Sequence, residues 1–405
     1  MVIQSLRMTS FRAHERSSCD FGMSVNLFYG PNGAGKTNIL EAIHYLCLGK
    51  SFVTSSDRFV VRKGARYTEV EGTFVRDDGR SMNVRMAYVP GEGKRLFLNR
   101  APLDRLADVV GELPVVVFSP EDASLTAGGP EERRRFMDNL LSQARPIYLD
   151  TLLKYRRVLK QRNRLLARLS SSRGLDARAV LASWDHELVR LGSYLVSARM
   201  RFVEEYSRYL EHAYRDLEAV AERPTLQYVT IDGVQSSMTE EEIGQVFRER
   251  LDESAHRERR RELTLVGPHR DELVFRLDGM LVRRYASQGQ HRTFGMSMKL
   301  AKYFYLYDQR QERPVLLLDD VFDQLDRSRS AAFLELLQSD RVGQSIITAT
   351  DVRPFEETVD FLKNGNAAQL VKKGSIGNAL ADRPYTGEVA AEQMASEVRE
   401  QPPKL

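Results

Sequence analysis

A glycine-rich octapeptide near the start of the chain constrains its fold more than any other feature. Residues 30–37 read GPNGAGKT and satisfy the pattern GxxxxGK[ST] at every fixed position. Residues 25–28 are typical of a strand, and the apolar spacing of residues 39–46 is helical. In this context loop amides face phosphate oxygens, Lys36 reaches the β- and γ-phosphates, and Thr37 binds Mg²⁺. The sequence predicts an ATP and Mg²⁺ site whose nucleotide-binding residues are Gly30, Pro31, Asn32, Gly33, Ala34, Gly35, Lys36, Thr37 and Asn38.

Two adjacent carboxylates supply the second half of such a site. Asp319 and Asp320 directly follow the apolar run at residues 315–318, which is typical of a buried parallel strand. A carboxylate there can hold the Mg²⁺ shell, and a second one can orient or deprotonate the attacking water. An acidic pair can also be a simple strand exit or helix cap. Joined to the phosphate loop, the pair predicts Mg²⁺ binding by Thr37 and Asp319, with Asp320 and Lys36 as the catalytic residues.

The segment at residues 285–290, with the sequence YASQGQ, precedes a helical run about 30 residues ahead of Asp319. It resembles the LSGGQ signature of ABC-type ATPases, although Gln288 replaces a glycine. Alone it would indicate only a helix N-cap. The resemblance implies that Asp326, in a segment like the ABC D-loop, lies at a subunit junction. It also implies contacts to a nucleotide held by a second subunit, made by Ser287, Gln288, Gly289 and Gln290.

Two positions depart from the ABC pattern. Asp351 follows a strand where transporter ATPases carry a histidine, so the role of that histidine does not transfer. The region that corresponds to the Q-loop, residues 117–122, has no glutamine. Glu121 can substitute for it, and the sequence SPED equally suits a turn that begins a helix.

The pattern of apolar residues divides the 405-residue chain into three regions and a tail. Strands with tight turns are expected in residues 1–28 and 67–98, long helices in residues 131–223, and further buried strands near residues 314–319 and 344–350. One long helix is expected to be lined on one face by Leu149, Leu152, Leu153, Leu159, Leu165, Leu166 and Leu169.

The expected fold class is α/β: an ABC-type P-loop ATPase head with a mixed β layer and a compact inserted helical arm. The head would comprise residues 1–126 and 263–375, and the arm residues 127–262. A flexible tail would follow over residues 376–405, because that stretch lacks apolar periodicity.

Positive charge is concentrated in the first part of this arm. Residues 127–174 contain twelve Lys or Arg against four Asp or Glu, whereas the whole chain has a formal charge of only +4. Such an excess can meet a phosphate backbone, and it can equally be a solvated helical face. The residues predicted to contact DNA are Arg156, Arg157, Lys160 and Arg164.

Further motifs, spread over nearly the whole chain up to about residue 375, resemble the RecF family of bacterial DNA-repair ATPases. They are residues 6–12, 33–42, 118–122, 128–136, 267–271 and 317–323. The resemblance implies ATP-dependent homodimerisation on double-stranded and gapped DNA, slow DNA-stimulated hydrolysis, and a role in replication restart and the SOS response. Its partners would be RecR and, indirectly, RecO in loading RecA. A similarly placed arginine implies a nucleotide contact for Arg12, and a surface arginine is the alternative.

Other classes fit less well. About 250 residues separate the phosphate loop from the signature, too few for the long heptad runs of SMC or zinc-hook ATPases. An ABC-type ATPase whose arm binds a protein rather than DNA is the alternative function. A single histidine in residues 267–271 gives no metal-ligand set, so that segment is interpreted as a structural turn.

The two cysteines, Cys19 and Cys47, form no CxxC pair, and the sequence contains no secretory signal or apolar run of about 18 residues. We therefore expect a cytoplasmic protein that does not associate with membranes.

Overall fold

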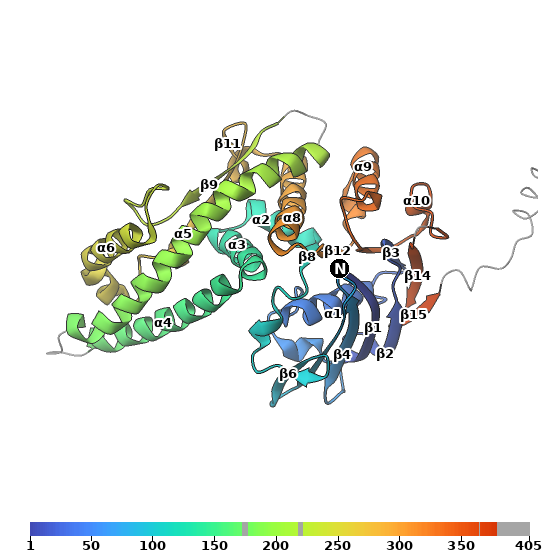
Figure 1. Cartoon of the computed structure of the whole chain (residues 1–405), viewed down its shortest axis with the longest axis horizontal. Helices are drawn as coiled ribbons and strands as arrows, with labels where there is room; N and C mark the ends of the chain where they lie inside the picture. Colours follow the sequence, from blue (N-terminus) through green and yellow to red (C-terminus); the bar gives the residue numbers. More distant parts are fainter. Residues whose placement is uncertain (172–176, 218–221, 364, 379–405) are drawn as a thin grey trace, which may run out of the picture.

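The computed structural model describes residues 1–171, 177–217, 222–363 and 365–378, and a few side chains in these ranges, Glu121 among them, lie outside the description. Figure 1 shows a β-rich part built around α1 (Lys36–Leu48) beside a helical part that contains the long helices α4 (Pro146–Ser171) and α5 (Ala177–Leu217). The structure thus has the α/β class expected from the sequence, with long helices interrupting the strands in chain order.

Two six-stranded sheets enclose α1. The first is antiparallel, in the order β2 (His14–Asp20), β1 (Val2–Phe11), β4 (Thr68–Val75), β5 (Ser81–Val89), β6 (Gly93–Leu98) and β7 (Ala101–Pro102). The second is mainly parallel, in the order β15 (Ser375–Asn378), β14 (Ala367–Lys372), β3 (Val25–Tyr29), β13 (Ser345–Ala349), β12 (Val315–Leu318) and β8 (Val115–Phe118). Ile39 of α1 shares one core with Phe74 and Leu317 from the two sheets.

Alternation along β12 divides its side chains between two cores. Val315 and Leu317 pack in the core that contains α1, whereas Leu316 and Leu318 pack on the opposite face. That second core continues into α8 (Gln288–Arg310) and α9 (Arg327–Gln338). Because both faces are covered, every residue of β12 and β13 is buried, which confirms the prediction of buried parallel strands.

The helical part is organised around α5. This helix packs against α4, α8 and α6 (Glu240–Arg261), while α3 (Pro130–Ala144) packs against α4 and α8. Local sequence sets several ends: Pro130 occupies the first turn of α3, and Thr239 and Glu242 form a capping box at the start of α6. The remaining short helices are α2 (Ala123–Ala127), α7 (Val282–Tyr285) and α10 (Arg353–Glu356), with 3₁₀ turns at Asp57–Val60, Leu106–Val109, Pro120–Asp122, Pro268–Arg270 and Phe322–Gln324.

The predicted leucine face of α4 was partly wrong. Leu152, Leu166 and Leu169 are buried, but Leu153 is 43% exposed. A helix turns by about 100° per residue, so Leu153 cannot share the face of Leu152. The buried positions are instead completed by Tyr148, Tyr155, Val158 and Arg162.

A three-stranded sheet crosses the expected end of the arm. β9 (Pro224–Val229) pairs antiparallel with β10 (Glu272–Leu277), which also pairs with β11 (Met280–Leu281). Residues on either side of position 262 are therefore joined by backbone hydrogen bonds, and the domain division stays a prediction. At the other end, β15 includes residues 376–378, which had been expected to belong to the tail, and residues 379–405 lie outside the described part. Among the described helices, none is long and apolar enough to span a bilayer.

Residues 267–271 serve a structural purpose. Arg199 of α5 is 2% exposed and donates to Asp271 Oδ2 at 2.6 Å, to Asp138 Oδ1 at 2.7 Å and to the carbonyl of Pro268 at 2.6 Å. His269 Nδ1 lies 2.7 Å from the hydroxyl of Tyr155. The network fixes this turn against α3, α4 and α5, as the interpretation of a structural turn requires. No cluster that could hold a metal ion occurs in the described residues.

Candidate nucleotide site

The glycine-rich loop connects β3 to α1, as its sequence predicted. Gly30 has a φ of +147°, and a Cβ atom there would lie 2.3 Å from the carbonyl oxygen of Val371. Gly35 has a φ of +105°, and its Cβ would lie 2.9 Å from His14 Nε2. Both positions therefore require glycine, because a side chain would combine an unfavourable backbone with a steric clash.

Lys36 is held inside the loop. Its side chain is buried, and its ammonium donates to the carbonyl of Gly30 at 3.0 Å and to that of Pro31 at 3.4 Å. Pro31, Asn32 and Gly33 are exposed, so the outer surface of the loop is accessible. An ammonium fixed among loop amides can contact phosphate oxygens without first being ordered.

The two carboxylates meet the loop at the ends of three strands. Thr37 Oγ1 donates to Asp319 Oδ1 at 2.8 Å, across 282 residues of sequence. The Thr348 hydroxyl lies 2.9 Å from Asp319 Oδ1 and 3.3 Å from Asp320 Oδ1, so its single proton can be donated to either carboxylate. The backbone N–H of Asp320 donates to Thr348 Oγ1 at 2.9 Å, and Asp320 has a left-handed φ of +46°. Thr348 thus joins the two predicted acidic residues, although no motif singled it out.

The environment of Asp319 suits a cation. Burial raises the pKa of its carboxyl group, and hydrogen bonds from Thr37 and Thr348 oppose that rise. Its charged form is therefore poorly solvated in the protein alone, and a cation at this position would stabilise it. The hydroxyl of Thr37 and the carboxylate of Asp319 are oxygen donors of the kind that Mg²⁺ prefers.

Contacts of Arg12 and His14 hold the turn between β1 and β2 against α1, the helix that follows the glycine-rich loop. Arg12 makes a bidentate ion pair with the buried carboxylate of Glu41, with Nε at 2.8 Å from Oε2 and Nη2 at 2.5 Å from Oε1. The guanidinium is therefore committed to α1, and its predicted contact with the nucleotide stays a prediction. His14 Nε2 lies 3.0 Å from the carbonyl oxygen of Gly35. Asn38, also predicted to bind ATP, accepts from the backbone of Ala13 at 3.4 Å.

The signature segment begins α8. Ser287 is the N-cap: its Oγ accepts from the N–H of Gln290 at 3.2 Å, and its own N–H donates to Gln290 Oε1 at 2.8 Å. Gln290 also donates to Glu222 at 2.7 Å. Ser287 and Gln288 are exposed, and Gly289 is half-buried. The segment is therefore rigidly capped and accessible from outside the subunit.

The D-loop aspartate, Asp326, and the aspartate at the position of the transporter histidine, Asp351, each have a local hydrogen-bond partner. Asp326 caps α9 by accepting from the N–H of Arg329 at 3.0 Å and is exposed. Asp351 accepts from Arg353 Nε at 2.6 Å, so an exposed ion pair occupies the position of the transporter histidine. The side chain of Glu121 lies outside the described part of the chain.

The predicted DNA-binding residues lie on the outer surface of α4. Arg156, Arg157, Lys160 and Arg164 are exposed, although Arg156 also pairs with Asp138 at 2.9 Å. Other cations of the same basic run are internal: Arg133 and Arg162 are buried and paired with carboxylates. The charge excess counted in the sequence is therefore larger than the excess on the surface.

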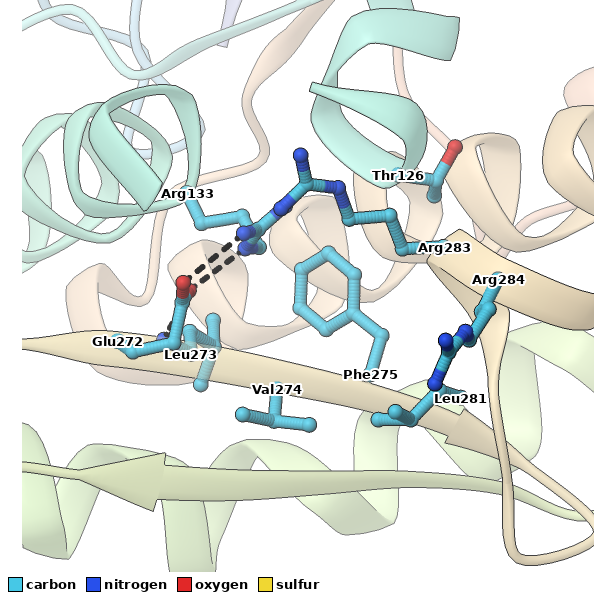
Figure 2. A pocket seen from close by; sticks show the side chains of 9 residues that line it. All are labelled: Thr126, Arg133, Glu272, Leu273, Val274, Phe275, Leu281, Arg283 and Arg284. Carbon is cyan, nitrogen blue, oxygen red and sulfur yellow. Dashed lines mark hydrogen bonds and ion pairs between the residues drawn. The ribbon is translucent and has the colours of Figure 1, made fainter. Parts of the chain in front are cut away.

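A cavity of about 390 Å³ lies beside β10, close to the start of the signature helix (Figure 2). Phe275 forms its floor, and Arg283 extends over the ring towards Arg133. Arg133 makes a bidentate ion pair with Glu272 at 2.7 and 3.0 Å. The sequence did not predict this cavity, because it depends on the packing of α2 and α3 against a distant strand.

The fold and the arrangement of loop, carboxylates and signature define an ABC-type P-loop ATPase head of the SMC class. The family model described as the RecF/RecN/SMC N terminal domain matches residues 2–371. The chain belongs to the RecF family.

Individual relatives agree with this assignment. The DNA replication and repair protein RecF of Salinibacter ruber is 53% identical over 384 residues, which is 95% of this chain and 93% of the relative. The RecF protein of Chloroherpeton thalassium is 43% identical over 88% of this chain and 97% of the relative. A solved structure of the recombination mediator protein RecF-ATPrS in the RecFOR pathway has a TM-score of 0.85 at 29% identity, over 93% of this chain and 98% of that one. An Smc head domain from Pyrococcus furiosus, at 14% identity with a TM-score of 0.54 over 98% of this chain and 99% of that one, shares the fold.

Proposed function

We propose that this protein is an ATP-dependent DNA-binding protein of recombinational repair, in which two subunits close around two nucleotides and clamp double-stranded DNA at single-strand gaps. The observation that carries the proposal is the meeting of Thr37, Asp319, Thr348 and Asp320 beside the glycine-rich loop. Membership of the RecF family supports the repair role, and the similar RecF structures with ATP or ATPrS support the ligand.

Nucleotide binding follows from the loop. Lys36 and the loop amides would hold the phosphates, and Thr37 and Asp319 would hold Mg²⁺. The bound metal ion would neutralise charge on the phosphate oxygens. Asp320 would orient the attacking water or accept its proton, and the hydrogen bonds through Thr348 would fix its position. We propose that hydrolysis at this site is slow and resets a switch.

Dimerisation follows from the signature. Ser287, Gln288, Gly289 and Gln290 are supplied by the start of α8, whose accessible N-terminus favours an anion. We propose that they contact the γ-phosphate of a nucleotide in the partner subunit, with Asp326 at the junction. ATP would then act as part of the interface, which makes the homodimer ATP-dependent.

DNA binding is assigned to the exposed face of α4 formed by Arg156, Arg157, Lys160 and Arg164. The similar solved structures belong to the RecFOR pathway by their descriptions, which supports RecR as a partner, RecO as an indirect one and RecA loading as the outcome. This role would be carried out in the cytoplasm, in replication restart and the SOS response. An arm that binds a protein instead of DNA is the alternative.

The direct test measures ATP turnover and the fraction of dimer with and without gapped duplex DNA. We expect dimers only with ATP, and faster turnover when gapped DNA is added. Duplex binding should also weaken steeply as salt rises, because Lys and Arg contacts to phosphates release counterions. Binding that ignores both ATP and salt would favour the protein-binding alternative.

A further inference from the structure

A cavity of about 650 Å³ separates the end of α1 from the middle of α8. It lies at the junction between the β-rich part and the helical part, with α3 and β8 contributing to its walls. Its lining is rich in cations, namely Lys50, Lys94, Arg135, Lys299 and Lys302.

Three of these cations already have carboxylate partners: Lys94 with Asp57 at 2.7 Å, Lys299 with Asp122 at 2.7 Å, and Arg135 with Glu132 at 3.3 Å. Lys50 and Lys302 differ from these three cations in their partners. Within the described residues, neither ammonium lies within 4.0 Å of a carboxylate, although Lys302 Nζ donates to Asn139 Oδ1 at 2.9 Å. Lys302 is only 6% exposed, so water cannot fully replace the missing counter-charge.

Three groups that line the cavity, Lys50, Lys302 and His44, have pKa values lowered first by burial and further by neighbouring cations. Burial lowers the pKa of Lys302 well below its ordinary value, and Lys299 and Lys50 lower it further. Although Lys50 is exposed, the protein around it partly excludes water, which lowers the pKa of its ammonium, and Arg156 and Arg135 lower it further. His44, which lines the same cavity, has its pKa lowered to about 3, mainly by burial and also by the three lysines. A bound anion would offset the mutual repulsion of these cations.

We propose that this cavity binds a phosphate group, with Lys50 and Lys302 as its principal ligands. A tetrahedral anion fits the chemistry, because Lys acts as a point-charge phosphate ligand and Asn139 adds an amide. The phosphate can come from a DNA backbone or from free phosphate in solution. The DNA backbone is favoured because Lys50 is exposed and close enough to Arg156 to be affected by its charge, which places the cavity beside the proposed DNA face of α4.

The position of the site also links two parts of the proposed ATPase. Lys50 directly follows the C-cap of α1, the helix that begins at Lys36. Lys302 belongs to α8, the helix that begins at the signature residues. A phosphate bound to both lysines would connect the loop helix to the signature helix. DNA binding would then be coupled to the relative position of these helices, a consequence that rests on the proposed function.

The test uses full-length Lys50→Gln and Lys302→Met variants, with Lys363→Gln as a control. Lys363 is exposed and is not among the residues that line the cavity, and its substitution removes the same charge. Each protein is titrated with labelled gapped duplex DNA at several salt concentrations. Each is also heated in sodium phosphate and in sodium chloride of equal ionic strength. The midpoint temperatures of thermal unfolding in sodium chloride alone show whether the variants remain folded.

If the cavity binds a phosphate of the DNA backbone, we expect each cavity variant to bind DNA about tenfold more weakly than the wild type. The slope of the logarithm of affinity against the logarithm of salt concentration should fall by about 0.9, while the control variant is unchanged. If the cavity binds free phosphate instead, both cavity variants would keep their affinity for DNA and would lose the thermal stabilisation that sodium phosphate gives the wild type. Wild-type behaviour of Lys50→Gln in both assays overturns the site, whether or not Lys302→Met folds. If Arg157→Gln on α4 still weakens DNA binding, the proposed function stands without the cavity site.

Discussion

The hydroxyl of Thr348, at the end of β13, lies 2.9 Å from Oδ1 of Asp319, at the end of β12. The same oxygen accepts from the backbone N–H of Asp320 at 2.9 Å. One side chain on a neighbouring strand therefore links the two acidic residues by hydrogen bonds.

Thr348→Val should lower ATP turnover about tenfold, because loss of one or two hydrogen bonds at the carboxylates costs about 1–2 kcal/mol of positioning. Nucleotide affinity should change little, since the loop and Lys36 are intact. Turnover and nucleotide binding are measured together, with Thr225→Val in β9 as the control for the same substitution. Wild-type turnover in Thr348→Val would show that the hydroxyl has no positioning role.

Asp320→Asn should reduce hydrolysis by at least about 100-fold, because an amide cannot accept the proton of the attacking water. ATP binding should persist, so the variant should accumulate as a dimer when ATP is present. Size-exclusion chromatography with light scattering measures that fraction. Unchanged turnover would remove Asp320 from catalysis.

Arg199→Met should destabilise the fold by about 3–5 kcal/mol, since it leaves the buried carboxylates of Asp138 and Asp271 without their shared cation. Arg201→Met is the control, because Arg201 is exposed on the same helix and should change stability by less than about 0.5 kcal/mol. Denaturant unfolding gives both values. Equal effects of the two substitutions would contradict the assigned network.

Acid should destabilise the fold through His269. Burial lowers its pKa to about 4 in the folded protein, whereas the unfolded chain has a value near 6.5. Between these values the unfolded chain binds more protons, so stability falls as pH falls, by up to about 1.4 kcal/mol per pH unit. His44, with a folded pKa of about 3, acts in the same direction. His269→Gln should make the loss between pH 6.5 and pH 4 shallower, and an unchanged slope would refute this origin.

The contacts of the candidate site were predictable only where a motif marked both partners. The glycine-rich pattern and the paired acids identify Thr37 and Asp319, which meet across 282 residues. Thr348 lies in a buried strand with no motif, so only the pairing of β13 with β12 brings it to the carboxylates. Arg12 was identified by resemblance, but its ion pair with Glu41 depends on packing of the β1–β2 turn against α1.

Charge was the least predictable property. Arg162 and Arg164 are two residues apart in one basic run, yet one is buried between carboxylates and the other is exposed. No motif marks Lys302 as internal, and the packing of α8 against α3 and β8 buries it. The helical period of a sequence predicts which side chains share one face of a helix, but it does not determine which neighbouring element covers that face.

The central claim is that each ATP site combines the loop of one subunit with the signature of another. It is tested by mixing Lys36→Ala protein with Ser287→Arg protein and measuring ATP turnover with gapped DNA. Either variant alone should be inactive, because every site in its homodimer is defective. A heterodimer contains one intact site, so an equal mixture should recover about a quarter of the wild-type rate if pairing is random. A mixture no more active than the separate variants would contradict the shared site.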